Sequence, residues 1–430
     1  MQHSTQNATP DLIARRKAVL GTHSPMFYND PLELVSGKGV WLRAVNGRRF
    51  LDAYNNVPHV GHAHPAIANA VSQQMRKLSL NTRYVNNRVV DYAEALLATL
   101  HPDLDRVSFG NSGSEANELA IRLARFRSGN TGLIFSDYSY HGTTLTLAQA
   151  TTGLATSEPM GENVRTIRIP DATGLTEQEA QQLLAEALSE VDTAIASLQE
   201  AGFGVAATLF DPLFSTEGLV KVPPGYVEGL IQRVRQAGGL YIADEVQSGF
   251  GRVGRFMWGH ELFNVTPDIV TMGKPMGNGH PIGATIMGHD LLEDFGAANM
   301  FFNTFAGNPV SSAAGHAVLD VMADEGLRER ATATGAFLKS ELTRELAGIS
   351  RFDEIRGDGL FAGMRFTDPD TGEADPTTAK QVVEEMYHQG VLISRVGRND
   401  EVLKIRPPLA FEEQHAEILI KKLTKIIRSL

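Results

Sequence analysis

The chain contains 430 residues, of which 42% are hydrophobic and 21% charged, a composition ordinary for a water-soluble globular protein. Its formal net charge of −11 argues against nucleic acid and against an anionic membrane surface as partners. Because the sequence has no cysteine, disulfides, thiol catalysis and zinc sites with cysteine ligands are excluded, and no metal site is predicted.

The length and the distribution of apolar residues predict a two-domain protein of the cytoplasm. A chain of 430 residues exceeds the size at which a single hydrophobic core stops growing. No apolar run approaches the roughly 20 residues that a membrane-spanning helix needs. The N-terminal stretch "MQHSTQNATPDLIARRK" is polar and lacks the apolar segment of a secretory signal.

Short apolar segments alternate with amphipathic helices through the middle of the chain. Helices are predicted over about Ser114–Arg127 and within Gly225–Gly239. Because most of the strands are continuous apolar runs, we expect a mainly parallel sheet covered on both faces, in an α/β domain. The predicted strands are Arg106–Gly110, Gly132–Asp137, Val205–Pro212, Gly239–Val246, Asp268–Gly273 and Ile282–Gly288.

The pattern changes after Asn308. A long helix, Pro309–Asp324, leads into shorter strands and two more helices, which indicate a smaller α+β domain. The predicted boundaries are an N-terminal segment, residues 1–57, that packs with the small domain, a large ligand-binding domain, residues 58–315, and the small domain, residues 316–430.

The segment "FGNSGSEANELAIRLAR", Phe109–Arg125, leads from a strand into a helix. Ser112 and Glu115 have the spacing of a capping box, and apolar residues follow at helical intervals. The free N–H groups and positive dipole end of a helix N-terminus, joined by two serine hydroxyls, can hold a phosphate. A well-capped helix without a ligand is the alternative.

The segment "GLYIADEVQSGFGRVGRF" contains G-x-G-x-x-G, the pattern of a dinucleotide-binding turn. We reject that interpretation because the glycines follow the strand end by several residues and no clear apolar-periodic helix begins after them. The stronger signal is Asp244 at the carboxyl end of the strand, since a buried carboxylate needs a positive partner. That partner is either a ligand or, more simply, Arg252 or Arg255.

A lone lysine, Lys274, follows the next predicted strand in "DIVTMGKPMGNGHPIGA". A P-loop is excluded because Asp268 occupies the first glycine position and Pro275 stands where Ser or Thr is required. In open α/β sheets ligands bind outside the carboxyl ends of strands, where a desolvated lysine is a candidate nucleophile for a carbonyl carbon.

Together these features meet the requirements of pyridoxal 5′-phosphate (PLP). This cofactor needs a lysine for a Schiff base, an acid beside its pyridine nitrogen and an anchor for its phosphate. Lys274, Asp244 and the turn Ser112–Ser114 supply these groups, so the sequence predicts a PLP site.

At this point the sequence resembles the class III (ornithine/ω-amino acid) family of fold-type I PLP enzymes over nearly its whole length. The resemblance implies a large PLP-binding domain with a mainly parallel seven-stranded sheet, beside the smaller α+β domain. The motifs that carry it are "GHAHP" (Gly61–Pro65), "NSGSEAN" (Asn111–Asn117), "YHG" (Tyr140–Gly142), "DEVQSGFGRVG" (Asp244–Gly254), "GKPMGNGHPIGA" (Gly273–Ala284) and "NTFAGNP" (Asn303–Pro309).

The resemblance also assigns roles to residues. Lys274 forms the Schiff base and moves the proton, while Asp244 pairs with the pyridine nitrogen. The phosphate lies at Ser112, Gly113 and Ser114, joined by Thr304 of a second subunit, so a homodimer with shared active sites is implied. His141 is a supporting or core histidine rather than a proton carrier. The remaining expected ring contacts are Val246 and Tyr140 on the two faces and Gln247 near the ring oxygen.

Two positions depart from the family pattern. Asp211-Pro212 stands where family aminotransferases commonly have Glu-Pro. The arginine that usually binds a substrate carboxylate is replaced by Lys404, with Arg406 two residues further on the same face of a strand. This change puts a bidentate carboxylate contact in doubt.

The N-terminal third, with the run Asn55-Asn56-Val57, is most similar to the branch that contains ethanolamine-phosphate phospho-lyase. The first hypothesis is therefore elimination of phosphate from a small phosphorylated amine such as O-phosphoethanolamine, giving acetaldehyde, ammonia and phosphate. Lys404, Arg406 and Arg83 are the candidate phosphate ligands. The alternatives are an ω-aminotransferase, which uses a keto acid, and a PLP-binding protein without turnover.

Overall fold

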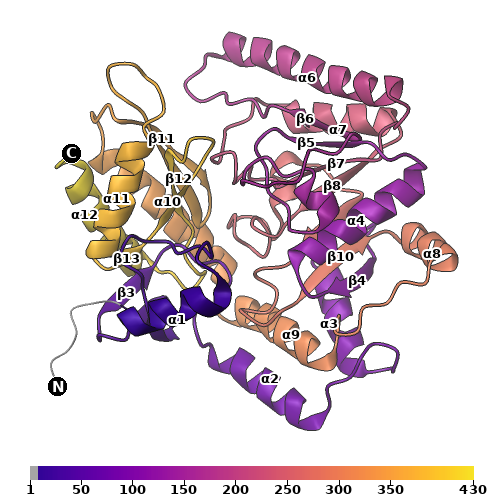
Figure 1. The fold of residues 1–430 in the computed structure, drawn as a ribbon, viewed down its shortest axis with the longest axis horizontal. Coiled ribbons are helices and arrows are strands. Elements are labelled where there is room, and N and C mark those ends of the chain that lie inside the picture. The colour runs from indigo at the N-terminus through magenta and orange to yellow at the C-terminus, as the bar shows by residue number, and fades with distance from the viewer. Residues whose placement is uncertain (1–7) are drawn as a thin grey trace.

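The computed structural model describes residues 8–430, so residues 1–7 of the predicted N-terminal segment lie outside the described residues. Its centre is a seven-stranded sheet with the strand order β4-β10-β9-β8-β7-β5-β6 (Figure 1). The strands are β4 (Arg106–Gly110), β5 (Leu133–Ser136), β6 (Val164–Ile167), β7 (Ala207–Phe210), β8 (Leu240–Asp244), β9 (Ile269–Met272) and β10 (Gly283–Met287).

The sheet confirms the predicted α/β class and its mainly parallel pairing. Strands β6, β5, β7, β8 and β9 are parallel along the sheet, whereas β10 is antiparallel to both β9 and β4. Strand β6 was not among the strands predicted from the sequence, because this short edge strand carries Arg165 and Thr166 between its two buried ends and lacks an apolar run.

Helices cover both faces of the sheet, which explains why every residue of its central strands β7, β8 and β9 is buried. Leu240 and Ile242 of β8 share one core with residues of α4 and α8, whereas Tyr241 and Ala243 share the other core with α6 and α7. The helices of this part are α2 (Pro65–Lys77), α3 (Asn87–Leu97), α4 (Gly113–Ser128), α5 (Leu145–Ala148), α6 (Glu177–Glu200), α7 (Tyr226–Gln236), η1 (Gly259–Phe263, a 3₁₀ helix), α8 (His289–Ala298) and α9 (Pro309–Asp324).

The N-terminal elements α1 to β3 and the C-terminal elements lie beside the large sheet, at the left of Figure 1. A four-stranded sheet joins β1 (Leu34–Lys38), β2 (Trp41–Ala44) and β3 (Arg49–Asp52) to β13 (Val391–Leu392). The parallel β3–β13 pairing joins the N-terminal segment to the C-terminal part of the chain, as expected if residues 1–57 pack with the small domain. The domain boundaries themselves stay a prediction. Helix α1 (Pro10–Leu20) precedes this sheet.

The C-terminal sheet has the order β11-β12-β15-β14 and brings the candidate cations near the large sheet. Its strands are β11 (Phe352–Asp358), β12 (Phe361–Phe366), β14 (Ser394–Val396) and β15 (Val402–Ile405). Lys404 lies within β15 and Arg406 follows its last residue. The accompanying helices are α10 (Leu327–Glu345), α11 (Pro376–His388) and α12 (Glu413–Ile427).

Within residues 8–430, no helix combines the length and the apolar character needed to cross a membrane. The cytoplasmic location stays a prediction.

Candidate active site

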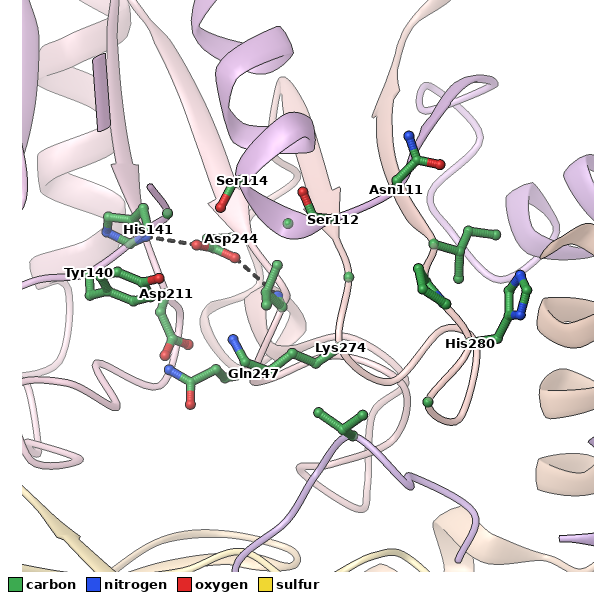
Figure 2. A pocket seen from close by; sticks show the side chains of 18 residues that line it. Asn111, Ser112, Ser114, Tyr140, His141, Asp211, Asp244, Gln247, Lys274 and His280 are labelled. Atoms are coloured by element: carbon green, nitrogen blue, oxygen red, sulfur yellow. Dashed lines mark hydrogen bonds and ion pairs between the residues drawn. The ribbon is translucent and has the colours of Figure 1, made fainter. Parts of the chain in front are cut away.

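The carboxyl ends of β4, β8 and β9 meet at one edge of the sheet. Strand β4 runs parallel to β9 because both are antiparallel to the intervening β10. As a result, the turn after Gly110, the carboxylate of Asp244 and the side chain of Lys274 all face one cavity of about 290 Å³ (Figure 2). The three motifs from distant parts of the sequence therefore form a single site, as ligand sites in open α/β sheets do.

The N-terminus of α4 forms one wall of this cavity. The Ser112 hydroxyl caps the helix by accepting from Glu115 N at 3.2 Å. The predicted capping box is only half correct, because the Glu115 carboxylate accepts from Asn111 N at 2.9 Å instead of from Ser112 N. The backbone of Gly113 and Ser114 thus remains at the cavity with the positive end of the helix dipole.

Asp244 is buried and accepts hydrogen bonds from three donors. Its carboxylate accepts from His141 Nδ1 at 2.7 Å, Asn117 Nδ2 at 3.0 Å and Val246 N at 3.0 Å. The plainer alternative, a salt bridge to an arginine, is wrong: Arg252 binds carbonyl oxygens, and Arg255 pairs with Asp358. Burial alone would raise the pKa of Asp244, but the bonds to His141, Val246 and Asn117 outweigh it and lower the pKa.

His141 and Asn117 orient this carboxylate. The Asn117 amide is fixed at both ends, since its Oδ1 accepts from Thr271 Oγ1 at 2.5 Å and its Nδ2 also donates to the His141 carbonyl at 2.8 Å. Within the described residues His141 Nε2 has no hydrogen-bond partner, so the hydrogen bond of the ring is the one from Nδ1 to Asp244. Asp244 is therefore held in one position before any ligand arrives.

The end of the Lys274 side chain faces the open cavity, although protein atoms surround its stem (Figure 2). Loss of water around it, and then the positive charge of Arg406, lower the pKa of Lys274. A lowered pKa increases the fraction of neutral amine, which is the form that attacks a carbonyl carbon or accepts a proton.

The residues around the cavity fit PLP. At position 113 a Cβ atom would come within 2.8 Å of Val246 Cγ2, so the approach of the α4 N-terminus to Val246 requires glycine. Val246 and Tyr140 supply an aliphatic and an aromatic surface for a ring. The helix N-terminus suits the phosphate, Asp244 the pyridine nitrogen and Lys274 the aldehyde carbon.

Gln247 connects this cavity to the two candidate cations of the C-terminal sheet. Its Oε1 accepts from Lys404 Nζ at 3.1 Å and also from an Arg406 guanidinium N–H. Both cations are buried, at 8% and 4% exposure, and the shared acceptor shows that their side chains point to the same place. Burial, followed by the charge of Arg406, lowers the pKa of Lys404 well below its ordinary value.

Two predicted site residues lie apart from this cavity within the same chain. Thr304 is exposed, and the chain does not fold it onto its own Ser112–Ser114 turn. Arg83 is also exposed and places its guanidinium 3.7 Å from the centre of the Phe302 ring. The structure therefore groups Lys404 and Arg406 but not Arg83.

The motifs of the sequence predicted no role for Asn117 or Ser215. Asn117 lies one and two helical turns before Ala120 and Ala124 on the buried side of α4, so a polar residue at that spacing was the available signal. Ser215 gave no such signal: its hydroxyl accepts from Gln247 Nε2 at 2.6 Å and donates to the Asp211 carboxylate, a contact that only the folded turn reveals.

Comparison with known proteins decides the family. The model of class III aminotransferases matches residues 26–427. The chain belongs to this family. Its cofactor is PLP, which agrees with the fit of the cavity, and the chain is a PLP-dependent class III enzyme.

The relatives include both phospho-lyases and aminotransferases. A solved phospholyase from Arthrobacter, in complex with phosphoethanolamine, is 56% identical and has a TM-score of 0.97, over 98% of this chain and 100% of that one. Ethanolamine-phosphate phospho-lyase homolog 1 of Caenorhabditis elegans is 35% identical over 97% of this chain and 93% of its own. An alanine–glyoxylate aminotransferase 2-like protein of Drosophila melanogaster is 37% identical over 96% of this chain and 86% of its own.

Proposed function

We propose that this enzyme is a phospho-lyase that eliminates phosphate from a small phosphorylated amine, with O-phosphoethanolamine as the first candidate substrate. The observation that carries the proposal is the buried pair Lys404–Arg406 beside the Lys274 cavity. The likeness to the Arthrobacter phospholyase, which was solved with phosphoethanolamine, supports the same substrate class.

The cation pair suits a phosphate better than a carboxylate. Among the described residues, neither Lys404 nor Arg406 makes an ion pair with a carboxylate, and the acceptor that they share is the neutral amide of Gln247. Buried charges are costly unless an opposite charge accompanies them. A phosphate dianion balances both cations, whereas a carboxylate balances one.

The residues of the site divide the elimination between them. Bound PLP supplies an electron sink for the carbon that bears the substrate nitrogen. Lys274 Nζ accepts the proton from that carbon, and Asp244 keeps a proton on the pyridine nitrogen. Lys404 and Arg406 bind the phosphate group, which leaves from the neighbouring carbon with the electron pair of the C–O bond. Water then releases acetaldehyde and ammonia.

A direct experiment separates this function from aminotransfer. The enzyme is incubated with phosphoethanolamine without any keto acid, and phosphate and acetaldehyde are measured. A lyase releases both in equal amounts over many turnovers. Release limited to one equivalent, accompanied by conversion to the pyridoxamine spectrum, would show an aminotransferase and end the proposal.

We also propose a homodimer in which Thr304 completes the phosphate site of the partner. Thr304 lies in an exposed segment that carries Met300 and Phe305, which are 98% and 72% exposed. Such apolar exposure is typical of an interface. Light scattering tests the dimer, and Thr304→Ala is expected to weaken PLP binding without changing the fold.

A further inference from the structure

The orientation of the Gln247 side chain is determined by its two ends. At one end, Nε2 donates to Ser215 Oγ at 2.6 Å, and the Ser215 hydroxyl donates in turn to Asp211. Asp211 is itself held by the N–H groups of Leu213 and Ser215, at 3.0 and 3.2 Å. The other end, the amide oxygen, must therefore face the two cations.

The amide oxygen is a weak partner for such a pair. Lys404 has three N–H donors and Arg406 has five. The acceptors that the structure gives them are Gln247 Oε1 and, for Arg406 Nε, the Tyr54 carbonyl at 3.4 Å. The Phe361 ring centre lies 5.3 Å from Lys404 Nζ and from Arg406 Cζ. The carboxylates of Asp211, Glu217 and Asp52 act on the pair only from beyond ion-pair distance. The neutral amide of Gln247 thus occupies a position at which an anionic group would bind the two cations more strongly.

Gln247 also lines the cavity that Lys274 faces (Figure 2), and its amide oxygen contacts both cations. We propose that Gln247 is an exchangeable partner of the Lys404–Arg406 pair: its amide oxygen binds the two cations before a substrate arrives, and the oxygens of a dianionic phosphate replace it. This inference rests on the proposed function, since it names how the same site receives the phosphate.

Exchange at Gln247 selects for charge. The incoming group must displace the Gln247 oxygen, which already accepts from both cations. A dianion compensates for the loss of these two hydrogen bonds because it pairs with both cations, whereas a single carboxylate neutralises only one of them. A permanent negative charge at position 247 would occupy the same place and exclude phosphate. Removal of the amide would leave the place open.

Calorimetric titration of the PLP-loaded enzyme tests the exchange, with inorganic phosphate and acetate as probes at constant ionic strength. Loaded enzyme is used so that the cofactor phosphate already occupies the α4 cradle. Gln247→Glu is expected to raise the Kd for phosphate at least tenfold, and Lys404→Met and Arg406→Met to do the same. Gln247→Ala is expected to leave it within threefold of wild type or to lower it. Wild type is expected to bind phosphate at least tenfold more tightly than acetate.

The matched control is Gln181→Glu, which makes the same chemical change at an exposed position of α6 and should leave the Kd within twofold. Equal loss in Gln247→Ala and Lys404→Met would overturn the proposal, because Gln247 would then bind the anion itself. Unchanged affinity in Gln247→Glu, or equal affinity for phosphate and acetate, would overturn it too. If Gln247→Glu does not fold, Gln247→Ala decides alone.

The same preparations are assayed with phosphoethanolamine, which separates the two proposals. If the binding pattern appears but no phosphate is released, the exchange stands and the proposed lyase activity fails. If phosphate is released but the binding pattern is absent, the activity stands and the exchange fails.

Discussion

Asp244 and the Lys404–Arg406 pair are both buried charges at the same cavity, yet their surroundings differ. The Asp244 carboxylate accepts from three donors, on His141, Asn117 and Val246, before any ligand is present. The two cations share one neutral amide oxygen. The hydrogen-bonded carboxylate of Asp244 is oriented in advance, which suits a permanently bound cofactor. The cation pair lacks a bound counterion, which suits a substrate anion that binds and is released in each turnover.

Charges from both regions act on the pKa of Lys274. Its pKa is lowered by loss of water and by Arg406, while the Asp244 and Asp211 carboxylates act in the opposite direction. The pKa of Lys274 therefore depends on charges from both regions, so a change of charge in either region should alter it.

The largest effect is expected when Lys274 is removed. In Lys274→Ala no residue bonds to the cofactor or takes the substrate proton, and turnover should fall by about 10⁴-fold or more. Phosphate release measures the loss, and the absorbance of the purified protein should shift from that of a Schiff base to that of the free aldehyde. Lys404→Ala is the matched control, which should keep the Schiff-base spectrum. Turnover above about 1% of wild type in Lys274→Ala would exclude the assigned role.

The second effect concerns the region of Asp244. Asp244→Asn keeps the size of the side chain but loses the charge, so kcat should fall about 10²- to 10³-fold. The neighbouring Glu245→Gln is the matched control. Glu245 accepts from Gly259 N and His260 N, each at 2.8 Å, and does not line the cavity.

Glu245→Gln should therefore lower the free energy of unfolding by about 1–3 kcal/mol and leave kcat nearly unchanged. Denaturant unfolding and steady-state kinetics measure both variants. If Asp244→Asn destabilised the protein as much as Glu245→Gln while keeping kcat, Asp244 would be a structural residue.

The third effect concerns the region of the cation pair. Lys404→Met and Arg406→Met should raise the KM for phosphoethanolamine about 10- to 100-fold, because each removes a charged bond of about 1.5–3 kcal/mol to the phosphate. Each should leave the melting temperature equal or higher, since apolar replacement of a poorly compensated buried charge is often stabilising. A fall in melting temperature with unchanged KM would contradict the proposed difference between the regions.

The smallest effect is the pH dependence of anion binding. As the pH rises through the lowered pKa of Lys404, the ammonium loses its charge, so sulfate affinity should fall several-fold. Burial raises the pKa of Glu217 to about 7, and its ionisation near Lys404 weakens binding in the same direction. Arg406, Lys274 and Asp211 are the other charges around Lys404.

Two variants separate these contributions in sulfate titrations between pH 6 and 10. Lys404→Arg stays charged and should retain only the Glu217 step, whereas Glu217→Gln should retain only the Lys404 step. An unchanged profile in both variants would exclude this origin of the pH dependence.

The sequence by itself determined the α/β class, the mainly parallel sheet, the PLP cofactor and the three motifs predicted to bind it. Each motif is one short continuous segment that contains both the end of a strand or helix and the functional side chain beside it. Lys274, Asp244 and the α4 N-terminus could be found for that reason. It did not determine the short polar edge strand β6 or the partners of Asp244, since Asn117 and His141 approach it from other segments.

Only the tertiary structure shows which of the three candidate cations are buried together beside Gln247. Lys404, Arg406 and Arg83 carry the same kind of charge in the sequence, and a lysine replacing an arginine shows neither burial nor partner. Folding buries the first two against Phe361 and Gln247 and leaves Arg83 exposed on Phe302. The energetic meaning of a charge depends on the water and the counterions around it, and these are set by contacts between residues far apart in the chain.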